Sequence, residues 1–306
     1  MSYPQVIRIG TRMSPLACFQ AKCVQKEISQ LGMESEIVEV TSDGDLDLVT
    51  PLYEMGIQGI FTKSLDIALL QNKIDLAVHS TKDVPTQQAS GLALNAVLKR
   101  AVAFDCMVLS PGKSAEDLTE PGQIGTSSLR RKLQWLHRYP QHTIENLRGN
   151  IQTRLQKLDD SNWIGAIFAQ AALERLEISS HQLITLDWMI PSPAQGAIGI
   201  MCRQDDAHAL EICAAVNHLD THVCVRVERD FLSALHGGCA VPIAAYAEME
   251  HGQIFFKANI MSKDAKQKIE VKMQFSLDQI HHAGSLAADE ILRMGAAEIV
   301  KSFRLS

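Results

Sequence analysis

The chain has 306 residues, of which 46% are hydrophobic and 21% are charged, a composition typical of a soluble globular protein with two or three domains. It has no apolar run long enough to span a bilayer, and its net charge of −6 argues against a nucleic-acid-binding protein. Met1–Gln5 lacks the charged and apolar regions of a signal peptide. We therefore expect a cytoplasmic protein with neither a membrane nor a nucleic-acid partner.

The seven cysteines are spread along the chain and include no C-x-x-C pair. This spacing argues against a disulfide framework and a structural zinc site, so we expect reduced thiols and no metal. His218 and His222 lie four positions apart, but no third ligand is close in sequence, and we expect them at the surface.

The first predicted unit is strand, helix, strand. Val6–Gly10 has the pattern of a strand, Ser14 is a suitable N-cap for the helix that follows, and Glu34–Val40 is a second strand. Arg12 stands just before the helix. Backbone N–H groups at a helix N-terminus favour an anion, and an arginine adds a bidentate donor for a carboxylate.

The chain then continues through a predicted long loop, Asp43–Gln58, and a helix, Phe61–Leu70, to the short apolar strand Ile74–Val78. His79–Pro85 follows at once, at the end of a strand where α/β proteins commonly bind ligands. Asp83 is therefore a candidate for acid–base chemistry. The alternative, which this stretch alone favours, is an aspartate that hydrogen-bonds its own turn.

A second α/β domain begins near residue 100 and repeats the order of strand, short loop and helix. Its strands are predicted at Cys106–Ser110, Gly122–Gly125, Thr143–Leu147 and Ile164–Ala169. Its helices are predicted from Ser127 or Ser128 to Arg138, over Ile151–Leu158 and over Gln170–Leu176.

Arginines recur near the predicted helix starts of both domains. They are Arg12, Arg130, Arg131, Arg148, Arg154 and Arg175. Each one alone is explained by a solvated or salt-bridged surface position. Together they predict a cleft between two α/β domains that binds several carboxylates or phosphates.

The last third combines helices and alternating segments. Ala197–Cys202 is predicted to be a strand that returns to the first sheet. Helices are predicted at Asp206–Val216 and Thr221–Leu235, strands at Val241–Met249, Gln253–Met261 and Lys268–Phe275, and one long closing helix at Leu277–Lys301. A three-stranded antiparallel sheet covered by helices indicates a small α+β domain.

Cys239 follows two glycines. A free cysteine is most often a small buried apolar residue. A thiol on a glycine loop is also a suitable point of covalent attachment, and the residues alone leave both interpretations open.

Several motifs resemble the porphobilinogen deaminase (hydroxymethylbilane synthase) family in order and spacing. They are Ile9–Ala17, Ala77–Pro85, Gly125–Arg131, Leu147–Asn150 with Thr153–Leu155, and Leu235–Pro242. The resemblance implies an α/β protein with two periplasmic-binding-protein-like α/β domains and a small α+β C-terminal domain that contains a three-stranded antiparallel sheet. The implied domains are residues 1–99 with 197–216, residues 100–196 and residues 217–306.

The family joins four porphobilinogen units head to tail into hydroxymethylbilane, releases ammonia at each step and acts in haem synthesis. The resemblance implies that Asp83 is the catalytic residue and that a dipyrromethane cofactor is bound to Cys239 by a thioether. Other implied cofactor-binding residues are Lys82, Ser128, Arg130, Arg131 and Arg154. Implied substrate-binding residues are Arg12, Ser14, Arg148 and Arg175. We expect a monomer that takes porphobilinogen as its small-molecule substrate.

Four positions depart from the family pattern: Gln58 replaces a lysine, Met201 a glutamate, His236 an acidic residue and Ala172 a glycine. A different class of function, a non-catalytic two-lobed module that binds small anions, also fits a basic cleft. Such a module needs neither Asp83 nor Cys239, so these two residues discriminate between the two functions.

Overall fold

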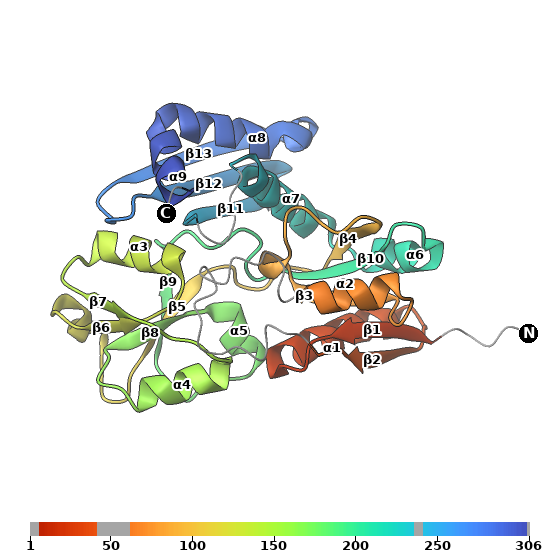
Figure 1. The fold of residues 1–306 in the computed structure, drawn as a ribbon, viewed down its shortest axis with the longest axis horizontal. Helices are drawn as coiled ribbons and strands as arrows, with labels where there is room; N and C mark the ends of the chain where they lie inside the picture. Colours follow the sequence, from red (N-terminus) through yellow and green to blue (C-terminus); the bar gives the residue numbers. More distant parts are fainter. Residues whose placement is uncertain (1–5, 42–61, 236–240, 305–306) are drawn as a thin grey trace, which may run out of the picture. The chain divides into compact units, whose positions relative to one another are not determined.

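The computed structural model describes residues 6–41, 62–235 and 241–304 (Figure 1), and it divides into two compact units. The described part of the first unit comprises residues 6–41, 62–101 and 196–223, and that of the second comprises residues 102–195, 224–235 and 241–304. No described helix is long and apolar enough to cross a membrane. The further division into three domains stays a prediction.

The first unit contains a five-stranded sheet with the order β2-β1-β3-β10-β4. Its strands are β1 (Ile7–Thr11), β2 (Ser35–Glu39), β3 (Leu76–Ser80), β4 (Leu92–Val97) and β10 (Ile198–Arg203). Its helices are α1 (Pro15–Gln30), α2 (Lys63–Leu70) and α6 (Ala207–Val216). β1 runs parallel to β2 and β3, whereas β10 runs antiparallel to both of its neighbours. The predicted return of the chain to the first sheet is confirmed.

The second unit contains a sheet with the same plan, in the order β7-β6-β8-β5-β9. Its strands are β5 (Asp105–Leu109), β6 (Gln123–Gly125), β7 (Thr143–Glu145), β8 (Gly165–Ala169) and β9 (Leu183–Leu186). Its helices are α3 (Leu129–Arg138), α4 (Ile151–Asp159) and α5 (Gln170–Arg175). β5, like β10, holds the fourth place and runs antiparallel to both neighbours. The repeat seen in the sequence is therefore a repeat of topology.

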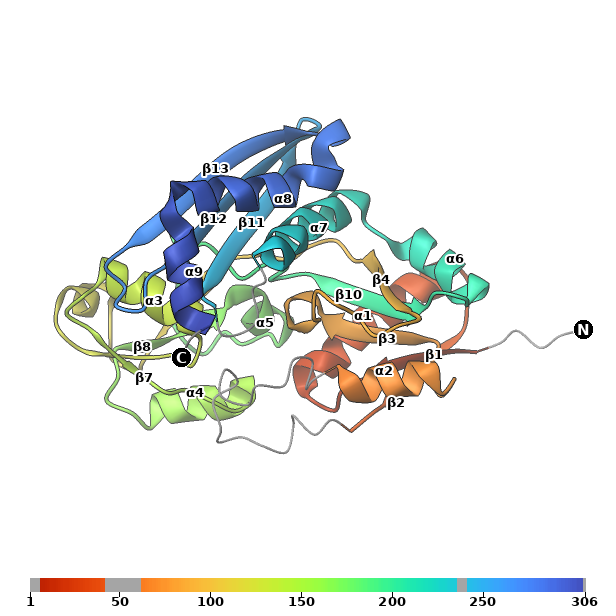
Figure 2. The ribbon, with the colours of Figure 1, turned by 45° about the horizontal axis from the view of Figure 1, so that its top comes forward.

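The second unit also contains an antiparallel sheet of three strands, β11 (Ile243–Glu250), β12 (Gln253–Met261) and β13 (Lys268–Ser276). Helices α7 (Leu219–Ala234), whose residues from Cys224 onward belong to this unit, α8 (Ile280–Ile291) and α9 (Ala297–Arg304) complete it. Figure 2 shows α8 lying along one face of this sheet. A Cβ added at Gly284 would lie 2.6 Å from the backbone nitrogen of Phe231, so the absent side chain lets α8 approach α7 closely.

Two features of the chain differ from the predictions. The single helix predicted over Leu277–Lys301 is wrong, because Gly295 has φ of 109° and separates α8 from α9. A left-handed residue cannot continue a right-handed helix, and glycine accepts that conformation without steric cost. The strands β4 and β9 were not predicted; both are edge strands of their sheets.

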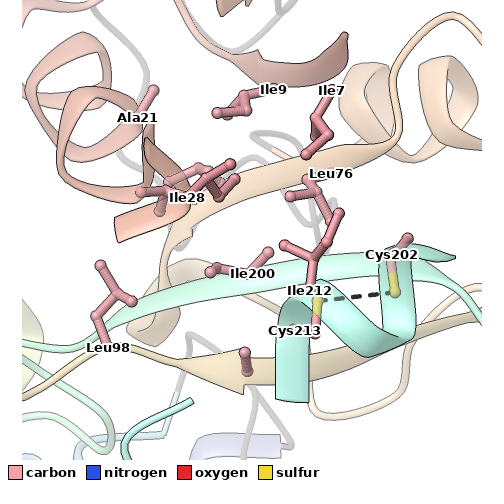
Figure 3. Close-up of a cluster of buried hydrophobic side chains, with 14 of the residues drawn as sticks. Ile7, Ile9, Ala21, Ile28, Leu76, Leu98, Ile200, Cys202, Ile212 and Cys213 are labelled. Atoms are coloured by element: carbon pink, nitrogen blue, oxygen red, sulfur yellow. Dashed lines mark hydrogen bonds between the residues drawn. The ribbon is translucent and has the colours of Figure 1, made fainter. Parts of the chain in front are cut away.

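One core cluster of the first unit lies between its sheet and the helices α1 and α6 (Figure 3). Alternate residues of β1 and β3, such as Ile7, Ile9 and Leu76, are fully buried there. Ile212 of α6 packs into the same cluster. This packing holds the sheet whose strand ends carry the candidate site.

Candidate active site

Asp83 lies in a short 3₁₀ helix (Thr81–Asp83) directly after β3. The turn is attached to β10, because the backbone N–H and the hydroxyl of Thr81 both donate to the carbonyl of Ala197 at 3.1 Å. Gly199 makes this approach possible, since a Cβ there would lie 2.8 Å from the Thr81 hydroxyl oxygen. The strand that returns from the second unit therefore positions Asp83.

A cavity of about 80 Å³ opens beside this turn. Its polar lining residues are Arg12, Ser14, Gln20, Thr62, His79, Ser80 and Asp83. Asp83 is exposed, and its carboxylate makes no hydrogen bond or ion pair with a described residue. The carboxylate therefore does not hydrogen-bond its own turn, and it is available to a ligand in the cavity.

Part of the cavity wall is the N-terminus of α1. Ser14 is the N-cap as predicted, and its side chain accepts the Ala17 N–H at 3.3 Å. Gln20, one turn further on, donates to the Ser80 hydroxyl at 2.8 Å and so joins α1 to the end of β3. A guanidinium, a helix N-terminus and a carboxylate thus line one cavity, which can bind a ligand with both anionic and cationic groups.

His79 lies in the same cavity wall and was not predicted as a site residue. The pKa of His79 is lowered to about 4, mainly by burial and to a smaller extent by the positive charge of Arg12. The imidazole is therefore neutral at pH 7. Its Nε2 is buried and has no hydrogen-bond partner among the described residues.

A larger cavity of about 310 Å³ lies against β2 and α2, and its wall includes Val38, Ile67 and Lys73. It contains none of the predicted site residues. We place the candidate site at the smaller cavity because only that one combines a carboxylate with a guanidinium and a helix N-terminus. Among the described residues, no group of His, Cys, Asp and Glu side chains could hold a metal.

In the second unit, two helix N-termini meet at the carboxyl edge of the sheet. Ser128 caps α3 by accepting the Arg131 N–H at 3.4 Å, and Asn150 caps α4 by accepting the Thr153 N–H at 2.8 Å. The preceding loops are joined, since the Ser127 hydroxyl accepts the Leu147 N–H at 2.8 Å. Two neighbouring N-termini form an electropositive edge suited to anions.

Arg148 lies in the loop before α4, at this edge. Its Nη1 is buried and has no hydrogen-bond partner within the described chain. Arg154, in α4, stacks over the Phe168 ring at 5.2 Å, and its Nε donates to the Asn150 carbonyl. A buried guanidinium nitrogen without an acceptor is costly, so Arg148 is suited to receive an anionic ligand.

Arg130 and Arg131 have a different environment. Both are buried in the first turn of α3 and share the carboxylate of Asp105: Arg130 Nη2 lies 2.8 Å from Oδ2, and Arg131 Nη2 lies 2.8 Å from Oδ1. Burial opposes ionisation of Asp105, but the two guanidinium groups outweigh it and lower the pKa of this carboxyl to about 2. Two cations at the positive end of a helix dipole need a negative charge beside them. Asp105 supplies that charge from within the chain.

The position of Arg175 corrects the predicted pattern. It is the last residue of α5 and not close to the helix start, so the six arginines are not at equivalent positions. Sequence reasoning also missed Asp105 and Gln195, whose side-chain amide donates to Asp105 at 2.8 Å. Nothing in a strand-like segment distinguishes a buried aspartate from an exposed one.

The other predicted site residues and the positions that depart from the family pattern lie in different environments. Cys239, Gln58 and His236 lie outside the described residues. Lys82 is exposed next to Asp83. Met201 is packed among apolar residues that include Leu65 and Ala77, so this departure from the family pattern fits an apolar core.

Three solved structures are similar to this chain over part of its length, each with a low TM-score. The VFT2 domain of BvgS from Bordetella pertussis is 12% identical, with 69% of this chain and 86% of that chain covered and a TM-score of 0.43. A putative periplasmic sulfonate-binding protein, SsuA from Methylobacillus flagellatus KT, is 15% identical, with 77% and 69% covered and a TM-score of 0.42. The methionine-binding protein MetQ is 15% identical, with 72% and 93% covered and a TM-score of 0.43.

Two family models match nearly the whole chain. Residues 7–211 match the porphobilinogen deaminase dipyromethane cofactor binding domain, and residues 222–293 match the porphobilinogen deaminase C-terminal domain. The first match alone extends over more than half of the sequence and contains both the cavity beside Asp83 and the electropositive edge of the second unit. The chain belongs to the porphobilinogen deaminase family, whose cofactor is dipyrromethane.

Proposed function

We propose that this protein is a hydroxymethylbilane synthase, which joins four porphobilinogen units head to tail and releases one ammonia at each step. The family match over residues 7–211 carries the proposal. We also propose that the protein acts as a cytoplasmic monomer in haem synthesis.

The residues present fit a dipyrromethane, which bears an acetate and a propionate on each ring. The Nη1 of Arg148, which has no hydrogen-bond partner in the described part of the chain, and the capped N-termini of α3 and α4 offer donors to such carboxylates. When bound, the cofactor supplies the terminal pyrrole to which substrate units are joined. We assign the thioether link to Cys239 and the carboxylate contacts to Ser128, Arg130, Arg131, Arg154 and Lys82.

Arg130 and Arg131 can bind a ligand carboxylate only with the N–H groups that their internal contacts do not use. Arg131 donates from Nε and Nη2 to Asp105 and from Nη1 to the Ile167 carbonyl. A guanidinium has five N–H donors, so each of these arginines keeps donors for a ligand carboxylate after its internal contacts are made. In this proposal the pair holds a carboxylate at a site whose own charge is partly neutralised.

For the substrate, we assign carboxylate binding to Arg12, Ser14, Arg148 and Arg175. Asp83 supplies the acid–base chemistry. Its carboxylate stabilises the positive charge that develops on the substrate methylene carbon as the C–N bond breaks and ammonia leaves. After the new C–C bond has formed, the same carboxylate accepts the proton lost from the pyrrole α-carbon. An exposed carboxylate without a partner among the described residues, at the edge of a cavity that also holds Arg12, supports this assignment.

The test is the intact mass of the purified full-length protein, measured with and without added porphobilinogen, combined with an assay for hydroxymethylbilane. We expect a mass greater than that of the sequence by one dipyrromethane, which is lost in Cys239→Ser. An unmodified mass after expression with ample porphobilinogen would overturn the covalent cofactor. An anion-binding module without catalysis would show neither adduct nor product.

A further inference from the structure

Two cysteines of the first unit lie side by side in its core. Cys202 is on β10 and Cys213 is on α6, and their sulfur atoms are 3.9 Å apart (Figure 3). Both side chains are buried, with 0% and 1% of their surface exposed. A disulfide has an S–S distance of about 2.05 Å, so a shift of roughly 2 Å would bring the two sulfurs to bonding distance.

The two sulfurs are not chemically equivalent. The thiol of Cys213 donates to the sulfur of Cys202, and the side-chain amide of Asn95 donates to the same sulfur at 3.0 Å. The hydrogen bond from Cys213 is the main cause that lowers the pKa of Cys202, against the effect of burial. The same hydrogen bond is the main cause that raises the pKa of Cys213, and burial raises it further. Cys202 is therefore the more readily ionised sulfur, and Cys213 retains its proton.

We propose that Cys202 and Cys213 form a redox pair, which a hydroperoxide converts into a disulfide that links β10 to α6. In the first step the Cys202 thiolate attacks one oxygen of hydrogen peroxide, the O–O bond breaks, and a sulfenic acid and hydroxide are formed. In the second step the Cys213 sulfur attacks the sulfenic sulfur, the S–O bond breaks, and the thiol proton leaves with the oxygen as water. In sum, two thiols and one hydrogen peroxide give one disulfide and two waters.

Access to the sulfurs requires local opening, because neither is exposed. α6 is a helix of 10 residues, and its N-terminal turn is held by the Asp206 carboxylate, which accepts the Ala209 N–H at 3.0 Å. Short helices at the surface of a unit open at a lower free-energy cost than central strands do. Reaction at Cys202 therefore proceeds through opening of α6, while β10 stays in the sheet.

Cys106 serves as the internal comparison. It is as buried as Cys202, and burial raises its pKa to about 12. No other described cysteine lies within hydrogen-bonding reach of its sulfur. The proposal therefore predicts selective oxidation of the pair, with Cys106 left as a thiol. None of the residues assigned to the reaction takes part, so the redox pair and the proposed function are tested separately.

The experiment treats the native full-length protein with hydrogen peroxide, alkylates the remaining thiols under denaturing conditions and maps the peptides without reductant. We expect one linked pair, Cys202 with Cys213, lighter by two hydrogen atoms than the separate thiol peptides, and an alkylated Cys106. Reduction with dithiothreitol should return both thiols. If Cys202 and Cys213 were both alkylated after oxidation, or if either were linked to another cysteine, the proposal would be overturned.

Two variants test the order of the steps. In Cys213→Ala the sulfenic acid cannot be resolved, so dimedone should label Cys202; in Cys202→Ala it should leave Cys213 unlabelled. The reverse labelling would contradict the assignment of Cys202 as the attacking sulfur. The wild-type peptide map needs neither variant, so the disulfide itself is tested even if a variant folds poorly.

Discussion

Arg131 and Asp105 form a buried ion pair in which Nε lies 3.0 Å and Nη2 lies 2.8 Å from the same carboxylate oxygen. Arg130 contacts the other oxygen, so one carboxylate serves two guanidinium groups. Gln195, the last residue of the second unit before the chain passes to the first, also donates to Asp105. Asp105 therefore sets both the charge of the α3 N-terminus and the position of the chain that leads to β10.

Asp105→Asn should destabilise the protein strongly. The substitution leaves two buried guanidinium groups without a counter-charge, which typically costs about 3–5 kcal/mol. Chemical denaturation measures the loss. As a control, Asp205→Asn changes an exposed aspartate, and it should unfold at the wild-type denaturant concentration. Equal stability of Asp105→Asn and the wild type would show that Asp105 does not neutralise the arginines.

Asp83→Asn should abolish most of the turnover while substrate still binds. Loss of a positioned acid–base group typically lowers a rate by about 10²–10⁴-fold, and the amide keeps the size of the side chain. Steady-state kinetics and direct binding of porphobilinogen separate the two effects. Asp278→Asn is the matched control, because Asp278 is also an exposed aspartate in a three-residue 3₁₀ helix. Near-normal turnover of Asp83→Asn would make Asp83 a structural residue.

Asp66 should make the protein less stable as the pH rises from 4 to 7. Burial raises the pKa of Asp66 from 3.8 to about 6, and its Oδ1 has no hydrogen-bond partner in the described chain. Between these pH values the folded protein holds a proton that the unfolded chain has lost, so stability falls as the pH rises through 6.

Asp66→Asn removes this titration. Because Asp66 is only partly buried, we expect a gain on the order of 1 kcal/mol at pH 7 and little change at pH 4. Denaturation at both pH values measures the difference, with Asp289→Asn, an exposed helical aspartate, as the control. A variant no more stable than the wild type at pH 7 would contradict the raised pKa.

Titration of His79 should have the opposite effect on the stability of the fold, over an overlapping pH range. Its pKa is lowered from 6.5 to about 4, so below pH 6.5 the unfolded chain binds a proton that the folded protein excludes. The stability associated with neutral His79 is present above pH 6.5 and is lost as the pH falls toward 4.

His79→Gln should therefore lose less stability than the wild type on acidification, by about 2–3 kcal/mol between pH 7 and pH 4. The exposed His282→Gln should keep the wild-type pH dependence. If His79→Gln and the wild type lost stability in parallel, His79 would not be held neutral by the fold.

Local features of the fold could be predicted because they depend on near neighbours. Ser14 and Ser128 cap helices because their hydroxyls reach an N–H three positions along the chain, a contact that sequence spacing alone predicts. The alternating segments predicted β12 as observed, Gln253–Met261, since a sheet with one buried face imposes a period of two. The long helix over Leu277–Lys301 failed at Gly295, because a single glycine is compatible with both a helix interior and a break.

By itself, the sequence determined the family, the order of most of the elements and the residue types available for chemistry at the ends of β3, β6 and β7. Tertiary structure alone decided which of those groups are already paired. Asp105 meets Arg131 from 26 positions away, and Cys202 meets Cys213 through the packing of α6 on β10. Pairing and pKa depend on distance in space and on exclusion of water, and neither quantity is contained in a local stretch of sequence.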